Sequence, residues 1–156
     1  MLYTKLLLFL TLIAYSIIVA QSFMYIIALK DVQNRMGAGS YIELRKLLDN
    51  SFRANFKFAV YAALVFNLLL VVSTSKYTGS LLFISSLIAF IALITDTLLT
   101  VKGNLPINGL INTWTVQSYP ENWVTYRAKW LQIFQYRQIA NITGFTCLLA
   151  GTIFGL

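Results

Sequence analysis

The sequence predicts an all-α fold, a bundle of four transmembrane helices in a single domain of 156 residues. Hydrophobic residues make up 58% of the chain and charged residues only 11%, whereas a soluble domain carries about 25% charged residues. The apolar residues also occur in four long runs, and a helix needs about 20 such residues to cross the hydrocarbon of a bilayer. Lipid is therefore the expected solvent, and we expect a multi-pass protein of a plasma or inner membrane.

The four apolar runs define the expected spans, which cover residues 6–29, 58–72, 81–99 and 131–156. The first run continues nine residues past Ala20, which favours a membrane span over a cleaved secretory signal. A loop of eight residues, 73–80, makes the second and third spans an antiparallel hairpin. Four spans place both chain ends on one side of the membrane and the two long connections, residues 30–57 and 100–129, on the other.

The formal net charge is +7, from twelve Lys and Arg against five Asp and Glu. Nine of the basic residues fall in or at the ends of the long connections, and only Lys5 and Lys76 lie on the opposite side. This asymmetry predicts that the long connections are cytoplasmic. No Arg-rich tract is present, so the charge indicates a lipid bilayer, and no nucleic acid, as the partner.

The residue types argue against a metal or cofactor. The chain has no histidine, the commonest metal ligand at neutral pH, and its single cysteine, Cys147, lies in an apolar run. No Walker, Rossmann, zinc or CxxC motif is present. We therefore expect no metal site and no cofactor.

Two capping-box patterns predict where the long helices begin. Ser40 with Glu43, and Ser118 with Glu121, have the spacing that lets a serine and a glutamate satisfy the first backbone donors of a helix. The first pattern predicts a continuous helix over residues 41–72, and the second predicts a fourth helix that starts near Pro120. The second and fourth helices should each extend roughly 15 Å beyond the membrane.

The fourth helix carries an aromatic and polar stripe. Its members recur every three or four residues and therefore share one helical face; they are Trp123, Arg127, Trp130, Phe134, Arg137, Asn141 and Gly144. Intramembrane ionisable groups usually mark functional sites, so the stripe predicts a ligand pocket, although such contacts can also simply hold a bundle together. For Trp123 alone, an anchor at the membrane interface is the favoured interpretation.

Charged and amide residues near the same membrane depth complete the candidate site. Asp96 and Arg137 both lie near the long-connection side, which predicts a structural ion pair between them. Gly103 and Pro106 predict irregular backbone around Asn104 and Asn108. The two asparagines could bond neighbouring backbone groups, their usual role in turns, or point into the mouth of a pocket.

These residues resemble the anthrone oxygenase-like family, small four-helix membrane proteins that are mostly of unknown function. The resemblance covers residues 102–137, about a quarter of the chain, and rests on an Asn-x-Pro-x-Asn segment followed by Trp and Arg positions. The matching positions are Asn104, Asn108, Trp114, Trp123, Arg127, Trp130 and Arg137. The resemblance implies oxygenation of polycyclic anthrones without a metal or flavin. Histidine, which is discussed as a participant in some members, is absent from this chain.

Two functions of different classes follow. The first is a membrane-embedded pocket for an apolar, aromatic or quinone-like molecule, in which Arg127 or Arg137 stabilises oxyanion charge as a catalytic residue. Asn104, Asn108, Trp114, Trp123, Trp130, Phe134 and Asn141 would contact the substrate. The second is a non-catalytic membrane subunit whose polar stripe binds lipid or another chain, either a copy of itself or a different partner.

Overall fold

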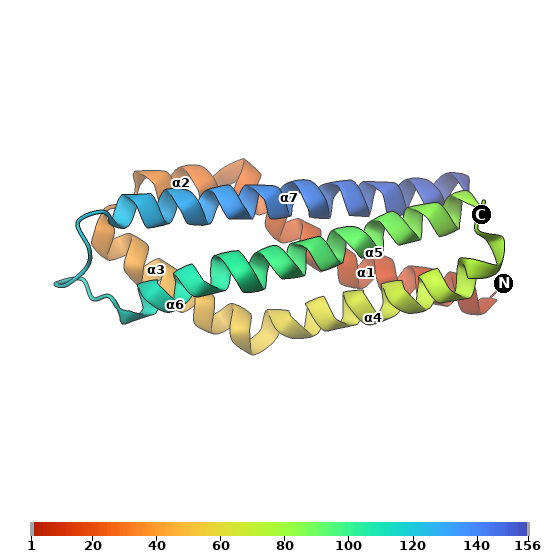
Figure 1. Ribbon diagram of the computed structural model, residues 1–156, viewed down its shortest axis with the longest axis horizontal. Coiled ribbons are helices and arrows are strands. Elements are labelled where there is room, and N and C mark those ends of the chain that lie inside the picture. The colour runs from red at the N-terminus through yellow and green to blue at the C-terminus, as the bar shows by residue number, and fades with distance from the viewer. Residues whose placement is uncertain (1, 156) are drawn as a thin grey trace.

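The computed structural model describes residues 2–155, which form four helical units (Figure 1). The first three units each contain a π-helical turn between two α-helices. They are α1 (Leu2–Met24), η1 (Tyr25–Leu29) and α2 (Lys30–Arg35); α3 (Ala38–Ser51), η2 (Phe52–Phe56) and α4 (Lys57–Thr74); and α5 (Leu81–Leu99), η4 (Thr100–Asn104) and α6 (Leu105–Thr113). The fourth unit is the single helix α7 (Trp123–Phe154), and a short 3-10 turn, η3 (Ser75–Tyr77), follows α4.

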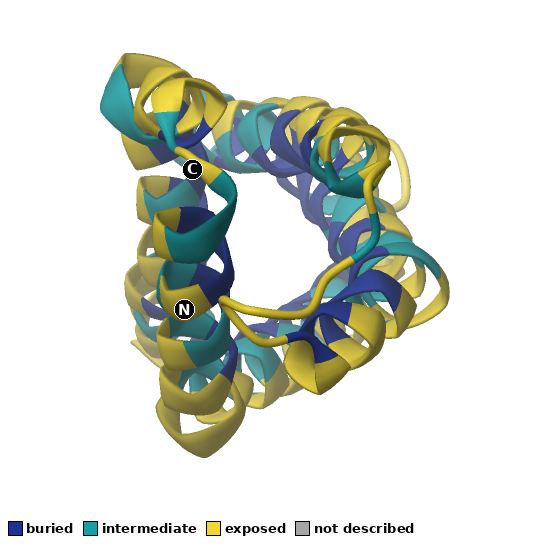
Figure 2. Cartoon of the chain, turned by 90° about the vertical axis from the view of Figure 1, so that its left-hand side faces the viewer, coloured by how far each residue is buried: buried dark blue, intermediate teal, exposed yellow. Residues whose placement is uncertain are grey.

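The four units form a closed bundle. Helix α1 packs against α4 and α7, and α5 packs against the same two helices from the other side. Both chain ends and the α4–α5 turn lie at one end of the bundle, and the α2–α3 and α6–α7 connections lie at the other, here called the long-connection end (Figure 1). Viewed along the bundle, buried residues face the axis and exposed residues face outward (Figure 2).

Three helical units are long and apolar enough to cross a membrane: Leu2–Arg35, Ala38–Tyr77 and Leu81–Thr113. The fourth, α7, has 32 residues and is long enough at about 1.5 Å per residue. Its first half carries several Gln, Arg and Lys residues that make it more polar than the others. The predicted end of the fourth span, residue 156, lies outside the described residues.

The structure corrects the predicted helix starts. Gly37, in an extended conformation, precedes the first residue of α3, so Ser40 lies inside the helix and does not cap it. Helix α7 begins at Trp123, after Asn122. Ser118 lies in the preceding loop, where its backbone N–H donates to the carbonyl and hydroxyl oxygens of Thr115 and makes no hydrogen bond with the helix start. In both places the loop backbone closes the helix start without the serine side chain.

The predicted irregular segment at residues 102–108 is also wrong, because this segment is helical. Pro106 lies in the first turn of α6, directly after the π-helical turn η4, and it lacks the N–H that a residue inside a helix donates. The third unit therefore extends past the predicted span, as the first does through α2. We predicted extensions for the second and fourth helices, and the first and third units are extended as well. The predicted continuous second helix is present as the unit Ala38–Tyr77, with the π-helical turn η2 inside it.

Candidate functional site

Two π-helical turns face each other across a cavity. The turns η2 and η4 both contribute lining residues, and Figure 1 shows the chain changing direction between α3 and α4. A π-helical turn inserts an extra residue, bends the helix and re-aims the side chains that follow; such turns are frequent at functional sites. At the level of the cavity, η2 thus lies between the polar helix α3 and the apolar helix α4, and η4 lies between α5 and α6.

The cavity has a volume of about 230 Å³. The apolar side chains of Phe52, Phe56 and Val60 line it, as do the exposed residues Tyr61 and Val101, so it reaches the outer surface between α4 and α5. The remaining lining is mostly polar and charged. It consists of Gln21, Arg45, Asp49, Arg53, Lys57, Asp96, Thr97, Thr100, Asn104, Leu105, Asn108, Trp130 and Arg137.

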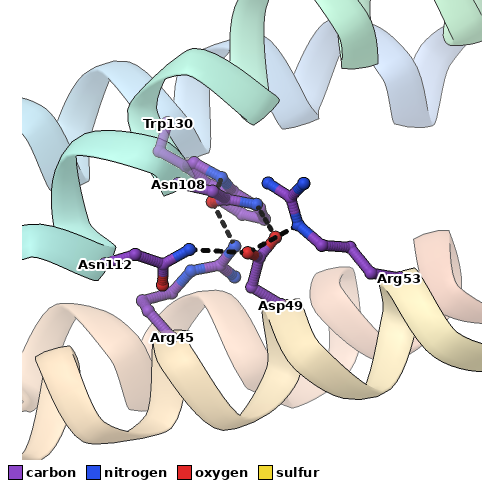
Figure 3. A network of polar contacts seen from close by, with 6 residues as sticks. All are labelled: Arg45, Asp49, Arg53, Asn108, Asn112 and Trp130. Atoms are coloured by element: carbon purple, nitrogen blue, oxygen red, sulfur yellow. Dashed lines mark hydrogen bonds and ion pairs between the residues drawn. The ribbon is translucent and has the colours of Figure 1, made fainter.

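Asp49 is the centre of the polar wall (Figure 3). Its carboxylate accepts hydrogen bonds from Asn108 Nδ2, Asn112 Nδ2 and Arg53 Nε, each at 2.8 Å, and the residue is only 3% exposed. Burial raises the pKa of the Asp49 carboxyl, but the hydrogen bonds from Asn112, Arg53 and Asn108 and the Arg53 charge outweigh it. The pKa therefore lies below its usual value, and Asp49 is ionised at neutral pH.

Arg45 lies beside Asp49 and is bonded to neutral groups. Its Nη2 donates to Asn108 Oδ1 at 2.8 Å and its Nη1 to the Tyr25 hydroxyl at 3.2 Å. The guanidinium carbon lies 3.8 Å from the ring centroid of Trp130, whose Nε1 donates to the same Asn108 oxygen at 2.9 Å. Asn108 thereby links Arg45 and Trp130 to the Asp49 carboxylate.

A second buried group lies deeper, toward the chain-end side of the cavity. Arg137 Nε is 2.6 Å from Asp96 Oδ1, and Arg137 Nη1 donates to Asn104 Oδ1 at 3.1 Å. Asn104 in turn donates to the backbone carbonyl of Trp130 at 3.0 Å. This group ties α5, η4 and α7 together with charge-assisted hydrogen bonds.

The structure brings only part of the predicted site to the cavity. Asn104, Asn108, Trp130 and Arg137 line it, and their side chains point across the bundle rather than to neighbouring turn backbone. The other predicted residues do not line it; they are Trp114, Trp123, Arg127, Phe134 and Asn141. The prediction that Arg127, Phe134 and Asn141 share this cavity is therefore wrong.

Arg127 and its neighbours stabilise the long-connection end instead. Arg127 Nη1 donates to the carbonyls of Gln33 and Met36 at 2.9 and 3.0 Å, and its guanidinium lies 4.6 Å from the Trp123 ring centroid. Trp114 packs edge-on against Tyr126. These contacts fasten α7 to α2 and to the end of α6, a role the helical spacing alone does not distinguish from ligand binding.

Phe134 and Asn141 lie in the packed interior. The rings of Phe134 and Trp130 are stacked with centroids 5.2 Å apart and an interplanar angle of 11°. That is direct contact, so the predicted insertion of a ligand ring between them is wrong. Asn141 is buried one turn before Gly144, which packs against the Tyr15 hydroxyl and Ala92.

Sequence reasoning missed Arg45, Asp49 and Asn112. A signal was present, because Arg45, Asp49 and Arg53 recur every four residues, as do Asn104, Asn108 and Asn112. Two polar stripes of equal spacing, one on α3 and η2 and the other on η4 and α6, are brought face to face where α3 packs against α6. The second stripe is recognisable only if residues 104–112 are taken as helical.

Among the described residues, no three His, Cys, Asp or Glu side chains gather as a set of metal ligands would. No protein-family model, curated protein or solved structure matches this chain.

Proposed function

We propose that the chain is a membrane-embedded binding protein for an apolar molecule with an aromatic or quinone-like ring. The supporting observation is the cavity of about 230 Å³ between η2 and η4. A cavity of about 150 Å³ accommodates benzene, so one or two fused rings fit here. Apolar side chains that hold a ring and polar groups that orient it are both features of small-molecule sites, and this cavity has an apolar wall and a polar wall.

The ring would lie against the apolar wall rather than on Trp130. One face of Trp130 is covered by the Arg45 guanidinium and the ring also stacks on Phe134. The free apolar surface belongs to Phe56, Val60 and Val101. A polar edge of the ligand would then meet the opposite wall around Asn108.

Membrane insertion is supported by the outer surface as well as by the three apolar units. Large apolar side chains face outward along the bundle, among them Phe9, Ile13, Leu68 and Ile91. A soluble monomer rarely exposes so much contiguous apolar surface. In our proposal α7 is the fourth span, since it packs beside α1 and α5, and the basic long-connection end is cytoplasmic.

The proposal extends to oxygenase chemistry through the family resemblance. Of the seven positions that match the family pattern, Asn104, Asn108, Trp130 and Arg137 line the cavity. Their meeting there supports the proposal that these positions form one pocket. Arg137 is the matching arginine in reach of a bound molecule and would stabilise oxyanion charge there. An anthrone would itself supply the electrons for oxygen.

The position of the stripe favours a small molecule over a partner chain. Trp130 and Arg137 are 3% and 7% exposed and border a cavity inside the bundle. A subunit-binding stripe would lie on the outer surface, where a second chain could contact it.

Two threonines of α5 offer a matched test. Thr97 lines the cavity and Thr95 faces outward, and each hydroxyl donates to the backbone carbonyl four residues earlier. In nanodiscs, 1,4-naphthoquinone should quench tryptophan fluorescence saturably. Thr97→Phe should fill the cavity and weaken this binding about tenfold, whereas Thr95→Phe should leave it unchanged.

Non-saturable quenching in the natural protein, or equal effects of the two variants, would contradict the binding proposal. The non-catalytic subunit would then be the better hypothesis. Co-purified molecules, released from the gently purified protein and identified by mass spectrometry, provide a second and independent readout.

A further inference from the structure

The charges that line the cavity do not balance. Four cationic side chains, Arg45, Arg53, Lys57 and Arg137, face only two carboxylates, Asp49 and Asp96. Four positive minus two negative charges leave an excess of two positive charges around a space partly closed off from water. Such an excess raises the local concentration of anions, and low-dielectric walls strengthen the attraction.

The ion pairs show which cations are left over. Asp96 pairs with Arg137 and Asp49 with Arg53. Arg45 is 3% exposed, forms no ion pair within residues 2–155, and its Nε has no hydrogen-bond partner there. A buried charge is costly unless an opposite charge accompanies it. Arg45 is thus a buried guanidinium without an ion-pair partner of its own among the described residues, and the nearby Asp49 is paired with Arg53.

Two further cations lie nearer the opening. Arg53 uses only its Nε on Asp49, and its two terminal nitrogens point away from that carboxylate (Figure 3). Lys57 follows one helical turn later, is exposed, and lines the same cavity. Phe56 and Val60 lie on the same stretch of chain. The cavity therefore combines charged donors with an apolar wall within two turns of helix.

We propose that the ligand is an amphipathic oxyanion: an aromatic ring carrying an ionised carboxylate or phenolate-type oxygen. The oxyanion would lie among Arg45, Arg53 and Lys57, and the ring against Phe56 and Val60. Hydrogen bonds from cationic donors to an ionised oxygen are stronger than those to a neutral one. This inference rests on the proposed binding function and names the chemical class that the site selects.

The test compares two probes of nearly the same shape. 2-Naphthoate is ionised at neutral pH and 2-naphthamide is neutral, so they differ mainly in charge. Binding is measured by isothermal titration to the protein in phosphatidylcholine nanodiscs, whose lipid carries no net charge to compete. We expect 2-naphthoate to bind at least about tenfold more tightly than 2-naphthamide.

Three charge-neutralising variants locate the effect. Lys57→Gln and Arg45→Gln should each weaken 2-naphthoate binding several-fold more than they weaken 2-naphthamide binding. Lys102→Gln removes an exposed charge from η4 that does not line the cavity and should alter neither. Since Lys57 makes no hydrogen bond to another element among the described side chains, its variant reports on binding even if Arg45→Gln lowers stability.

The outcomes separate the two proposals. Equal binding of both probes, or equal loss of 2-naphthoate binding in Lys57→Gln and Lys102→Gln, overturns the oxyanion inference and leaves the binding function standing. Binding of neither probe, together with no saturable quenching by 1,4-naphthoquinone, overturns both.

Discussion

Asp96 and Arg137 form a buried ion pair that can be dismantled one charge at a time. They are 2% and 7% exposed, with 2.6 Å between Asp96 Oδ1 and Arg137 Nε. Removing one partner of a buried pair costs about 3–5 kcal/mol, because the remaining charge is left uncompensated. Removing both avoids that penalty, so the double variant should be less destabilised than the sum of the single variants.

The structure also predicts unequal single effects. After Asp96→Asn, the Arg137 guanidinium keeps its hydrogen bond to Asn104 Oδ1. After Arg137→Gln, Asp96 loses its hydrogen bond at 2.6 Å to a cationic donor. We therefore expect the free energy of unfolding to fall by about 3 kcal/mol in Asp96→Asn and by about 5 kcal/mol in Arg137→Gln. The coupling free energy between the two substitutions should be about 2–3 kcal/mol.

The assay is unfolding in mixed micelles, followed by circular dichroism, for the four proteins of the double-mutant cycle. Asp31 and Arg35 provide the control cycle, since they form an ion pair at 3.0 Å with side chains 67% and 80% exposed. An exposed pair of this kind contributes only about 0.3–0.5 kcal/mol. Additive effects at Asp96 and Arg137, or coupling no larger than in the control, would refute the reasoning.

Three further predictions concern other parts of the molecule. The pKa of Asp49 is lowered in the folded protein. Its contribution to stability is therefore present above the unfolded pKa of about 3.9 and is lost as the pH falls toward the folded value. Melting temperatures measured over a pH series should show this decrease on the acid side, and Asp49→Asn should flatten it. Gly144→Ala should destabilise the folded protein by about 1–3 kcal/mol in thermal denaturation, because the added methyl group would collide with a tyrosine hydroxyl of α1. Gly109→Ala, with open space around it, should stabilise by up to about 1 kcal/mol, and the opposite order of the two glycine variants would contradict the packing. A cysteine at Leu2 should react with an impermeant maleimide in intact cells and one at Gly39 should not; the reverse labelling pattern would invert the proposed orientation.

Much of the helical architecture could be predicted from local pattern. The apolar runs locate four helical segments, and the short loop between residues 73 and 80 places the second and third side by side, as observed. The matched depth of Asp96 and Arg137 indicated a contact that the structure contains. Such features depend on apolar length and chain connectivity, which the sequence displays directly.

The helix ends were less predictable. The Ser40 and Ser118 patterns have the right composition for caps, but neither serine occupies a capping position. Gly103 and Pro106 suggested a break where the chain in fact continues as η4 and α6. A π-helical turn absorbs the disturbance, and tertiary contacts such as the Asn104 bond to the Trp130 carbonyl stabilise the helix that follows.

The sequence by itself determined that the chain is helical and apolar, that both chain ends lie at the same end of the bundle, and which helix faces carry polar groups. These features follow from composition, from the number of helices and from the 3.6-residue period. Only the tertiary structure decided which polar groups meet. Asp49 binds Asn108 and Asn112, 59 and 63 residues away, whereas Arg127, on the same helical face as Trp130, turns to the backbone of α2 and the residue after it. Partner choice depends on the bend, rotation and relative shift of whole helices, and these are set by packing across the bundle rather than by any local pattern.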